Sequence, residues 1–143
     1  MKRYVELIIR ATALVAIPSL SYAQQQTEDI GKHEYFVSCA ICHGDKGKAD
    51  GPFVVWLKKP AADLSKIQKD NMGMFPFDRI YEVIDGRAEV AAHGPRDMPI
   101  WGERYKREAI GLWGVFQTPH RVDSFVRGRI VALVGYIYTL QAK

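Results

Sequence analysis

The stretch FVSCAICHGDKGKADGP, residues 36–52, restricts the chemistry of this chain more than any other part of it. It contains the only two cysteines, Cys39 and Cys42, and a histidine, His43, directly follows the second one. On a helical turn, residues at positions i and i+3 lie on the same side, so both thiols face one direction with the imidazole beside them. Two cysteines and a histidine in this arrangement are found in disulfides, redox-active thiol pairs, zinc sites and covalent haem-binding sites.

The first three of these chemistries fit the sequence poorly. A disulfide between Cys39 and Cys42 closes a very small loop and stabilises little. A redox-active cysteine pair is typical of a βαβ unit, and a zinc site needs a second pair of ligands. The sequence shows neither of these. CAICH has all five residues of the haem-attachment pattern, in which the thiols add to two vinyl groups and His43 faces the iron. The motif therefore predicts one covalently attached haem c per chain.

The N-terminus has the pattern of a secretory leader: a basic start, an apolar run over residues 11–20, and SYA before QQQ. We expect a signal peptide over residues 1–23, cleaved after Ala23, and a mature domain over residues 24–143 in the periplasm, which agrees with haem attachment outside the cytoplasm. The alternative is an uncleaved anchor, but the apolar run is about half of the roughly 20 residues that a spanning helix needs. No stable membrane span is expected in the mature chain.

The charge of the chain gives little indication of its partners. The formal net charge is +4, and Lys2, Arg3 and Arg10 against Glu6 supply +2 of it within the first ten residues. The remaining +2 is too small to indicate binding to nucleic acid.

Three segments have helical periodicity. Residues 29–40 form a predicted first helix, with Asp29 as its cap and Gly31, Tyr35 and Cys39 spaced by four on one face. A middle helix is expected over FPFDRIYEVID, ending at Gly86, while PFVVWLKK is either a short helical turn or extended.

The last predicted helix, within residues 122–141, has the strongest pattern, with Asp123 as its N-cap. Its Gly128 and Gly135 each cost roughly 1 kcal/mol relative to alanine, which predicts close packing at these positions. Since no strand pair or hairpin signal occurs, the chain is expected to be a single all-α domain.

The second axial ligand of a haem has several candidates. Met98 precedes Pro99, which favours an extended conformation and presents the thioether from a loop, 55 residues after His43. Met72 and Met74 flank Gly73 in a turn-like stretch and are expected to fill gaps near the haem edge. His93 is a further competitor.

Together with GDKGKADGP, PAADLS, DMPIWG and the last helix, the motif resembles the mono-haem class I cytochromes c of the bacterial periplasm over most of the mature chain. The family usually carries glycine or another small residue where Lys48 and Ala49 stand. The resemblance implies a helical fold wrapped around one haem, with Met98 as second ligand. It also implies crossing first and last helices that pack Gly31 and Tyr35 against Leu133 and Tyr136.

Further residues are candidates for the surroundings of a haem. Pro52 is expected to offer its carbonyl to the free ring nitrogen of His43, because metal-bound histidines usually donate that proton. Trp101, Arg96 and Arg87 are candidate donors to the haem propionates, with solvated surface positions as the alternative for the arginines.

The expected function is electron transfer without enzymatic activity, between a dehydrogenase or respiratory complex and an oxidase or reductase, either as a free carrier or as the cytochrome subunit of an oxidoreductase. The alternative is a gas-binding sensor or peroxidase-like protein with an open iron, in which His93 or Arg96 is the distal polar group.

The segment ERYKREAIGLWGVFQTPHR, residues 103–121, is either an additional helix and loop or a docking surface. Packing is favoured for Trp113 and Phe116, since large aromatic side chains are usually buried. The basic residues of the segment either steer an acidic partner or form a solvated face.

Overall fold

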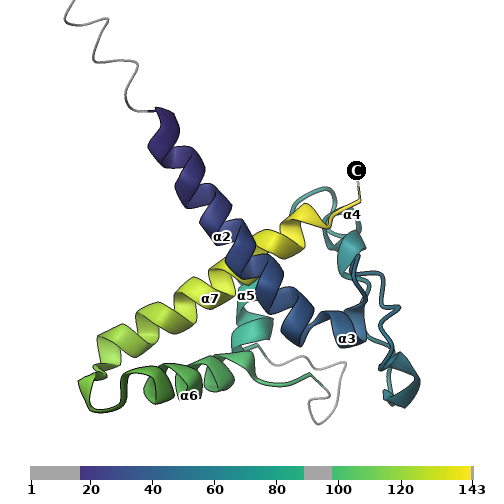
Figure 1. Ribbon diagram of the computed structural model, residues 1–143. Helices are drawn as coiled ribbons and strands as arrows, with labels where there is room; N and C mark the ends of the chain where they lie inside the picture. Colours follow the sequence, from purple (N-terminus) through teal and green to yellow (C-terminus); the bar gives the residue numbers. More distant parts are fainter. Residues whose placement is uncertain (1–16, 89–97, 143) are drawn as a thin grey trace, which may run out of the picture.

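The computed structural model describes residues 17–88 and 98–142. In this part of the chain every regular element is helical and no strand occurs, which confirms the all-α prediction (Figure 1). The three longest helices are α2 (Ile17–Ser38), α6 (Trp101–Trp113) and α7 (Pro119–Thr139). The shorter ones are α3 (Ala40–His43), η1 (Val54–Trp56), η2 (Leu64–Lys66), α4 (Ile67–Asp70), α5 (Phe77–Asp85) and η4 (Gly114–Phe116).

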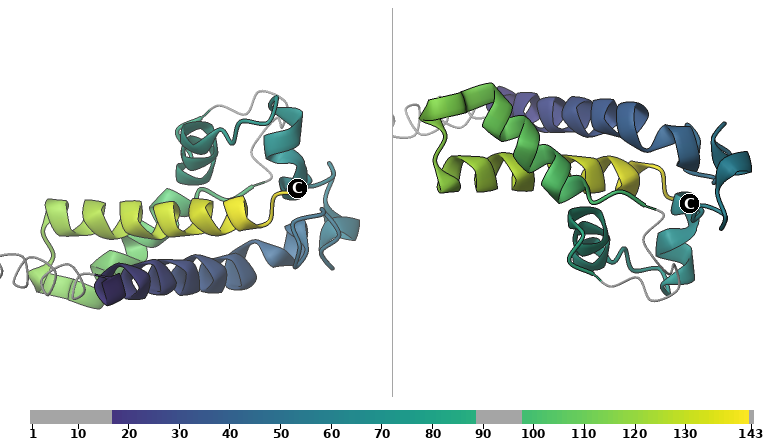
Figure 2. Two further views of the ribbon diagram at one scale, coloured as in Figure 1. Left: turned by 90° about the horizontal axis from the view of Figure 1, so that it is seen from above. Right: turned by 90° about the horizontal axis from the view of Figure 1, so that it is seen from below.

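Helices α2 and α7 cross and pack against each other (Figures 1 and 2). Gly31 permits the crossing, because a Cβ atom there would lie 2.0 Å from the carbonyl oxygen of Ala132. Next to it, the rings of Tyr35 and Tyr136 lie 5.2 Å apart, and Leu133 is fully buried. The expected pairing of the first and last predicted helices through these residues is confirmed.

The expected role of glycine within α7 is wrong. Gly128 and Gly135 are exposed, and nothing lies within 4 Å of a Cβ atom built at either position. Both lie on the solvent side of α7, so no packing compensates for their lower helix propensity.

The start of α7 also differs from the prediction. The side chain of Thr118 accepts a hydrogen bond from the backbone N–H of Arg121, and Pro119 occupies the first turn, where its missing N–H costs nothing. The predicted cap, Asp123, lies inside the helix and pairs instead with Arg127 at 2.9 Å.

Helix α2 begins at Ile17, so Asp29 lies inside it and the expected capping role of Asp29 is wrong. No glycine or proline between residues 19 and 30 stops the helix, and it therefore runs through Ala23. Residues 1–16 of the predicted leader lie outside the described residues, and cleavage after Ala23 stays a prediction. Among the helices that the structure describes, none combines the length and the apolar character that a bilayer crossing requires.

The segment between residues 103 and 121 forms most of α6, which lies alongside α7, followed by η4 (Figures 1 and 2). Trp113 packs edge-on against Phe125 at a ring distance of 5.5 Å, whereas Phe116 is 76% exposed. The packing prediction is therefore confirmed for Trp113 and wrong for Phe116. The middle helix α5 ends as predicted, at Gly86 with a left-handed φ of 91°.

Candidate functional site

The CAICH motif lies at the junction of two helices. Cys39 forms the turn after α2, and its backbone N–H donates to the carbonyl of Tyr35 at 2.8 Å. The backbone N–H of His43 donates to the carbonyl of Cys39 at 2.9 Å, so helical hydrogen bonding continues through the motif. Both thiols are free; that of Cys39 is buried and that of Cys42 is partly exposed. The structure thus brings two unpaired thiols and an imidazole together on one turn.

The environment of Cys39 suppresses its reactivity in the folded chain. Burial raises the pKa of its thiol to about 12, with Arg104 opposing the shift and Cys42 adding to it. The thiol is therefore protonated at neutral pH, and the thiolate is the nucleophilic form.

The imidazole of His43 has a defined protonation state. Its Nδ1 lies 2.9 Å from the backbone carbonyl oxygen of Ala62. Because a carbonyl only accepts hydrogen bonds, Nδ1 carries the proton and Nε2 keeps its lone pair. Burial lowers the pKa of His43, which also favours the neutral ring. A neutral histidine with Nδ1 held in this way is the form that binds metals.

The predicted partner of that ring nitrogen was Pro52, and the structure corrects this expectation. Pro52 is exposed, and the carbonyl that faces His43 belongs to Ala62. The loop after the motif turns back early: Gly51 packs against the backbone of α3, and the N–H of Phe53 donates to the Ile41 carbonyl at 2.9 Å. Residues near 62 return to the histidine instead, since the backbone N–H of Leu64 donates to the Gly47 carbonyl at 2.6 Å.

The loop after His43 is held in place from α2. The hydroxyl of the fully buried Tyr35 donates to the carbonyl of Gly44 at 2.6 Å. Gly44 has a φ of 78°, which glycine adopts without strain, whereas Ala49 has a φ of 60° in the same loop. Ala49 is thus a strained position in the segment where the resembled family carries a small residue or glycine.

Met98 and Trp101 contact the apolar cluster that contains Cys39. Trp101 and Cys39 both belong to this buried cluster, and Met98 packs against it while remaining partly exposed. Ile80 and Ile84 of α5 are further members of the cluster. The predicted second ligand thus lies against the apolar core to which Cys39 belongs. Met72 and Met74, in contrast, are 85% and 62% exposed.

Trp101 has an unsatisfied polar group. Its Nε1 is buried and, among the described residues, no hydrogen-bond acceptor faces it. A buried N–H without a partner is costly, so an acceptor at this place would stabilise the protein.

Sequence reasoning missed Arg104 as a site residue. Its guanidinium lies 4.8 Å from the centre of the Trp101 ring, and Nη1 donates to Ser38 Oγ at 3.1 Å. The spacing in the sequence indicates this contact, because Arg104 follows Trp101 by three residues and lies on the same side of α6.

One predicted propionate donor, Arg87, has its described contacts elsewhere. Arg87 pairs with Asp85 and lies 6.0 Å from the ring centre of Tyr81. His93 and Arg96, the candidate distal residues of an open iron, lie outside the described residues.

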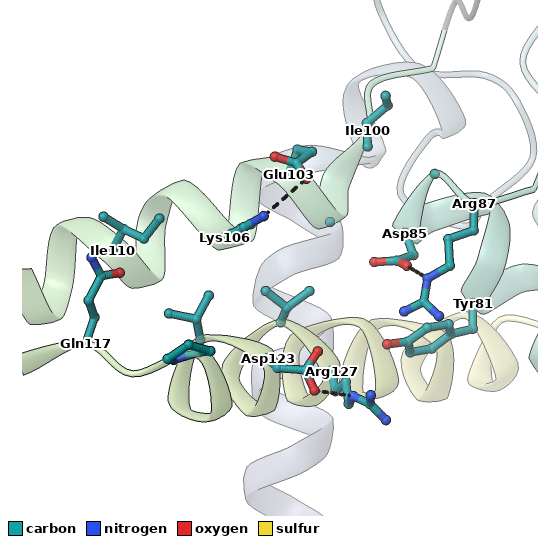
Figure 3. A pocket seen from close by; sticks show the side chains of 15 residues that line it. Tyr81, Asp85, Arg87, Ile100, Glu103, Lys106, Ile110, Gln117, Asp123 and Arg127 are labelled. Carbon is teal, nitrogen blue, oxygen red and sulfur yellow. Dashed lines mark hydrogen bonds and ion pairs between the residues drawn. The ribbon is translucent and has the colours of Figure 1, made fainter.

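A groove of about 960 Å³ runs between α5, α6 and α7, and Arg87 lines it (Figure 3). Its charged side chains pair within the groove: Arg87 with Asp85, Lys106 with Glu103 at 3.8 Å, and Arg127 with Asp123 at 2.9 Å. None of the residues of the CAICH motif lines the groove.

The described residues contain no cluster of three or more histidine, cysteine or acidic side chains that is able to hold a metal ion. Comparisons with protein-family models, with curated proteins and with solved structures found no match for this chain. The assignment of a function therefore depends on the residues of the chain itself.

Proposed function

We propose that this chain is a periplasmic electron-transfer protein that carries one covalently attached haem c in a class I cytochrome c fold. The observation that carries the proposal is the state of His43: its Nδ1–H is held by the Ala62 carbonyl and its Nε2 is left for a metal, directly after two free thiols. Neither a disulfide nor a redox-active thiol pair requires an imidazole that is oriented in this way.

Each residue of the site has a specific task in this proposal. Cys39 and Cys42 would hold the haem through thioether bonds, and His43 would bind its iron through Nε2. Because burial raises the pKa of Cys39 to about 12, we expect attachment to precede complete folding, while the thiol is still exposed.

Met98, in the segment that precedes α6, would supply a thioether sulfur to the iron. A thioether favours the ferrous state more than a second imidazole does, and two protein ligands would leave no position open for a substrate. When bound, the haem would supply one-electron redox chemistry.

Trp101 and Arg104 fit a haem carboxylate on the same side of the site. The buried Nε1 of Trp101 has no partner among the described residues, and a propionate oxygen is an acceptor of the required kind. Arg104, stacked on the Trp101 ring, supplies a positive charge near that acceptor. The fit of these two side chains supports the proposal independently of His43.

The experiment is to express the chain with haem-maturation machinery and to record oxidised and reduced absorption spectra with and without carbon monoxide. Haem that stays on the chain after denaturation, a sulfur-to-iron charge-transfer band and no response to carbon monoxide would support a closed His/Met iron. A prompt carbon monoxide shift without that band would indicate an open, ligand-binding haem instead. Absence of haem, when a known cytochrome c matures in the same cells, would contradict the proposal.

A matched pair of variants tests the attachment. Cys42→Ala should leave at most one thioether bond and release much more haem on acid extraction. A second change, Ser124→Ala, alters an exposed residue of α7 and should leave attachment complete.

A further inference from the structure

The connection between α6 and α7 exposes a group of apolar side chains. Leu112 is 62% exposed, Val115 is 91% exposed and Phe116 is 76% exposed. We refer to these three residues as the apolar tip. Monomeric soluble domains usually expose such residues singly, and a group of them marks a contact site.

The apolar tip is an ordered feature. Arg121 donates from Nη1 to the carbonyl of Phe116 at 3.2 Å, and its guanidinium lies 5.6 Å from the ring centre of Trp113. Trp113 in turn packs on Phe125. These contacts hold η4 in place while Val115 and Phe116 remain exposed.

Two arginines that flank the apolar tip in the sequence lack an ion-pair partner among the described residues. The two carboxylates of α6 are engaged, Glu103 with Lys106 and Glu108 with Arg129. Arg107 and Arg121 have no acidic partner among the described residues. An anionic surface would therefore complement the tip.

The position of the tip separates it from the candidate haem site. Helix α3, which contains Cys42 and His43, lies at one end of the molecule, and the α6–α7 connection lies at the other end in all views (Figures 1 and 2). A contact through the tip leaves the CAICH end free for redox partners.

We infer that the apolar tip binds an anionic lipid surface, with Leu112, Val115 and Phe116 entering the interfacial layer and Arg107 and Arg121 contacting lipid phosphates. A projecting apolar group with a basic rim suits the soft, anionic boundary of a bilayer. A second copy of the chain is a poorer occupant, because symmetric contact would place the unpaired arginines of both copies together. This inference goes beyond electron transfer and does not depend on it.

The test is co-sedimentation of the purified full chain, with or without attached haem, with vesicles of phosphatidylcholine alone or with phosphatidylglycerol added. We expect binding to the anionic vesicles that weakens more than about tenfold in the Val115→Ser/Phe116→Ser variant. We expect a loss of about fivefold in Arg107→Gln. The matched control is Val55→Ser/Trp56→Ser, an adjacent pair that is 77% and 75% exposed in η1 and should leave vesicle binding unchanged.

Hydrogen exchange provides a second measurement. It distinguishes membrane binding through the apolar tip from membrane binding through an uncleaved leader. The amides of residues 112–118 should exchange more slowly when the protein is bound to anionic vesicles. Equal binding to neutral vesicles, equal effects of the two serine pairs, or no protection of these amides would each overturn the inference. The inference would also be overturned if the chain did not bind vesicles and the tip variant failed to bind a purified partner protein that the unchanged chain binds. The tip would then be a protein contact.

Discussion

Gly31 is the position at which an added Cβ atom would disturb the packing of α2 against α7 most directly. A Cβ atom there would meet the Ala132 carbonyl oxygen at 2.0 Å and the Ala132 carbonyl carbon at 2.6 Å, and both are backbone atoms that cannot rotate away. The α2 and α7 backbones must separate to accept any side chain at this position.

We therefore predict that Gly31→Ala destabilises the protein by about 3 kcal/mol, because it forces the crossing helices apart. Gly128→Ala is the control, since nothing lies within 4 Å of its added Cβ atom and alanine is the better helix former. The control should stabilise by roughly 0.5–1 kcal/mol. Urea unfolding measures both changes, and a loss of stability in both variants would contradict the packing argument.

Met98 is the residue on which the proposed redox chemistry depends. Met98→Ala should lower the reduction potential by on the order of 0.1 V and create carbon monoxide binding, because it removes the thioether ligand and opens the iron. Met72→Ala is the matched control, since Met72 is 85% exposed. Redox titration and carbon monoxide difference spectra measure the effects. If Met98→Ala leaves both properties unchanged, Met98 is not the ligand.

Three helices are joined by one charge network in which Glu34 is buried and the other two charged groups are partly exposed. Arg129 of α7 pairs with Glu34 of α2 and with Glu108 of α6, the latter at 3.3 Å. Glu34 is 5% exposed, and its Oε2 also accepts a hydrogen bond from the Tyr105 hydroxyl at 3.0 Å. Removing one partner of such a network leaves a charge buried without compensation.

Arg129→Met should consequently destabilise the protein by about 3–5 kcal/mol, because Glu34 loses its counter-charge. Arg127→Met, two residues earlier on the same helix, removes a surface pair with Asp123 and should cost less than about 1 kcal/mol. Thermal unfolding at neutral pH compares the two variants. Similar losses would show that the network adds no more than a surface pair does.

At the scale of the whole molecule, the described contacts of α2 lie in its C-terminal part. Among the α2 residues whose burial is described, the first buried one is Gly31, eight residues after the predicted cleavage site at Ala23. The contacts of α2 with α7 and α6 then follow at Glu34 and Tyr35.

We predict that the exported holo protein begins at Gln24 and that its mass equals residues 24–143 plus one haem. Because the described contacts of α2 begin at Gly31, residues 24–143 exported with an unrelated cleavable leader should have the same melting temperature as the protein exported with its own leader, within about 2 °C. Intact-mass spectrometry and calorimetry measure these properties. A mass that includes residues 1–23 would favour the anchor alternative.

The close grouping of the motif residues and the helical class of the fold could be predicted from local sequence. Cys39, Cys42 and His43 form a pattern that one turn of helix brings together, and Gly86 stops α5 because only glycine takes its left-handed φ without strain. These features depend on neighbours within a few residues. The boundaries of α2 and α7 were harder to predict, because capping by Thr118 rather than Asp123 depends on small differences between adjacent polar side chains.

Other features depend on contacts between distant segments. The partner of His43 is the carbonyl of Ala62 and not that of Pro52, and every residue carries a carbonyl, so side-chain identity does not reveal which one is used. The stacking of Arg104 on Trp101 beside the end of α2 and the burial of Trp101 Nε1 likewise arise from packing of α6 against the other helices. Gly31 contacts a backbone while Gly128 faces solvent, although both are helical glycines, because the crossing point of α2 and α7 is set by the complete core.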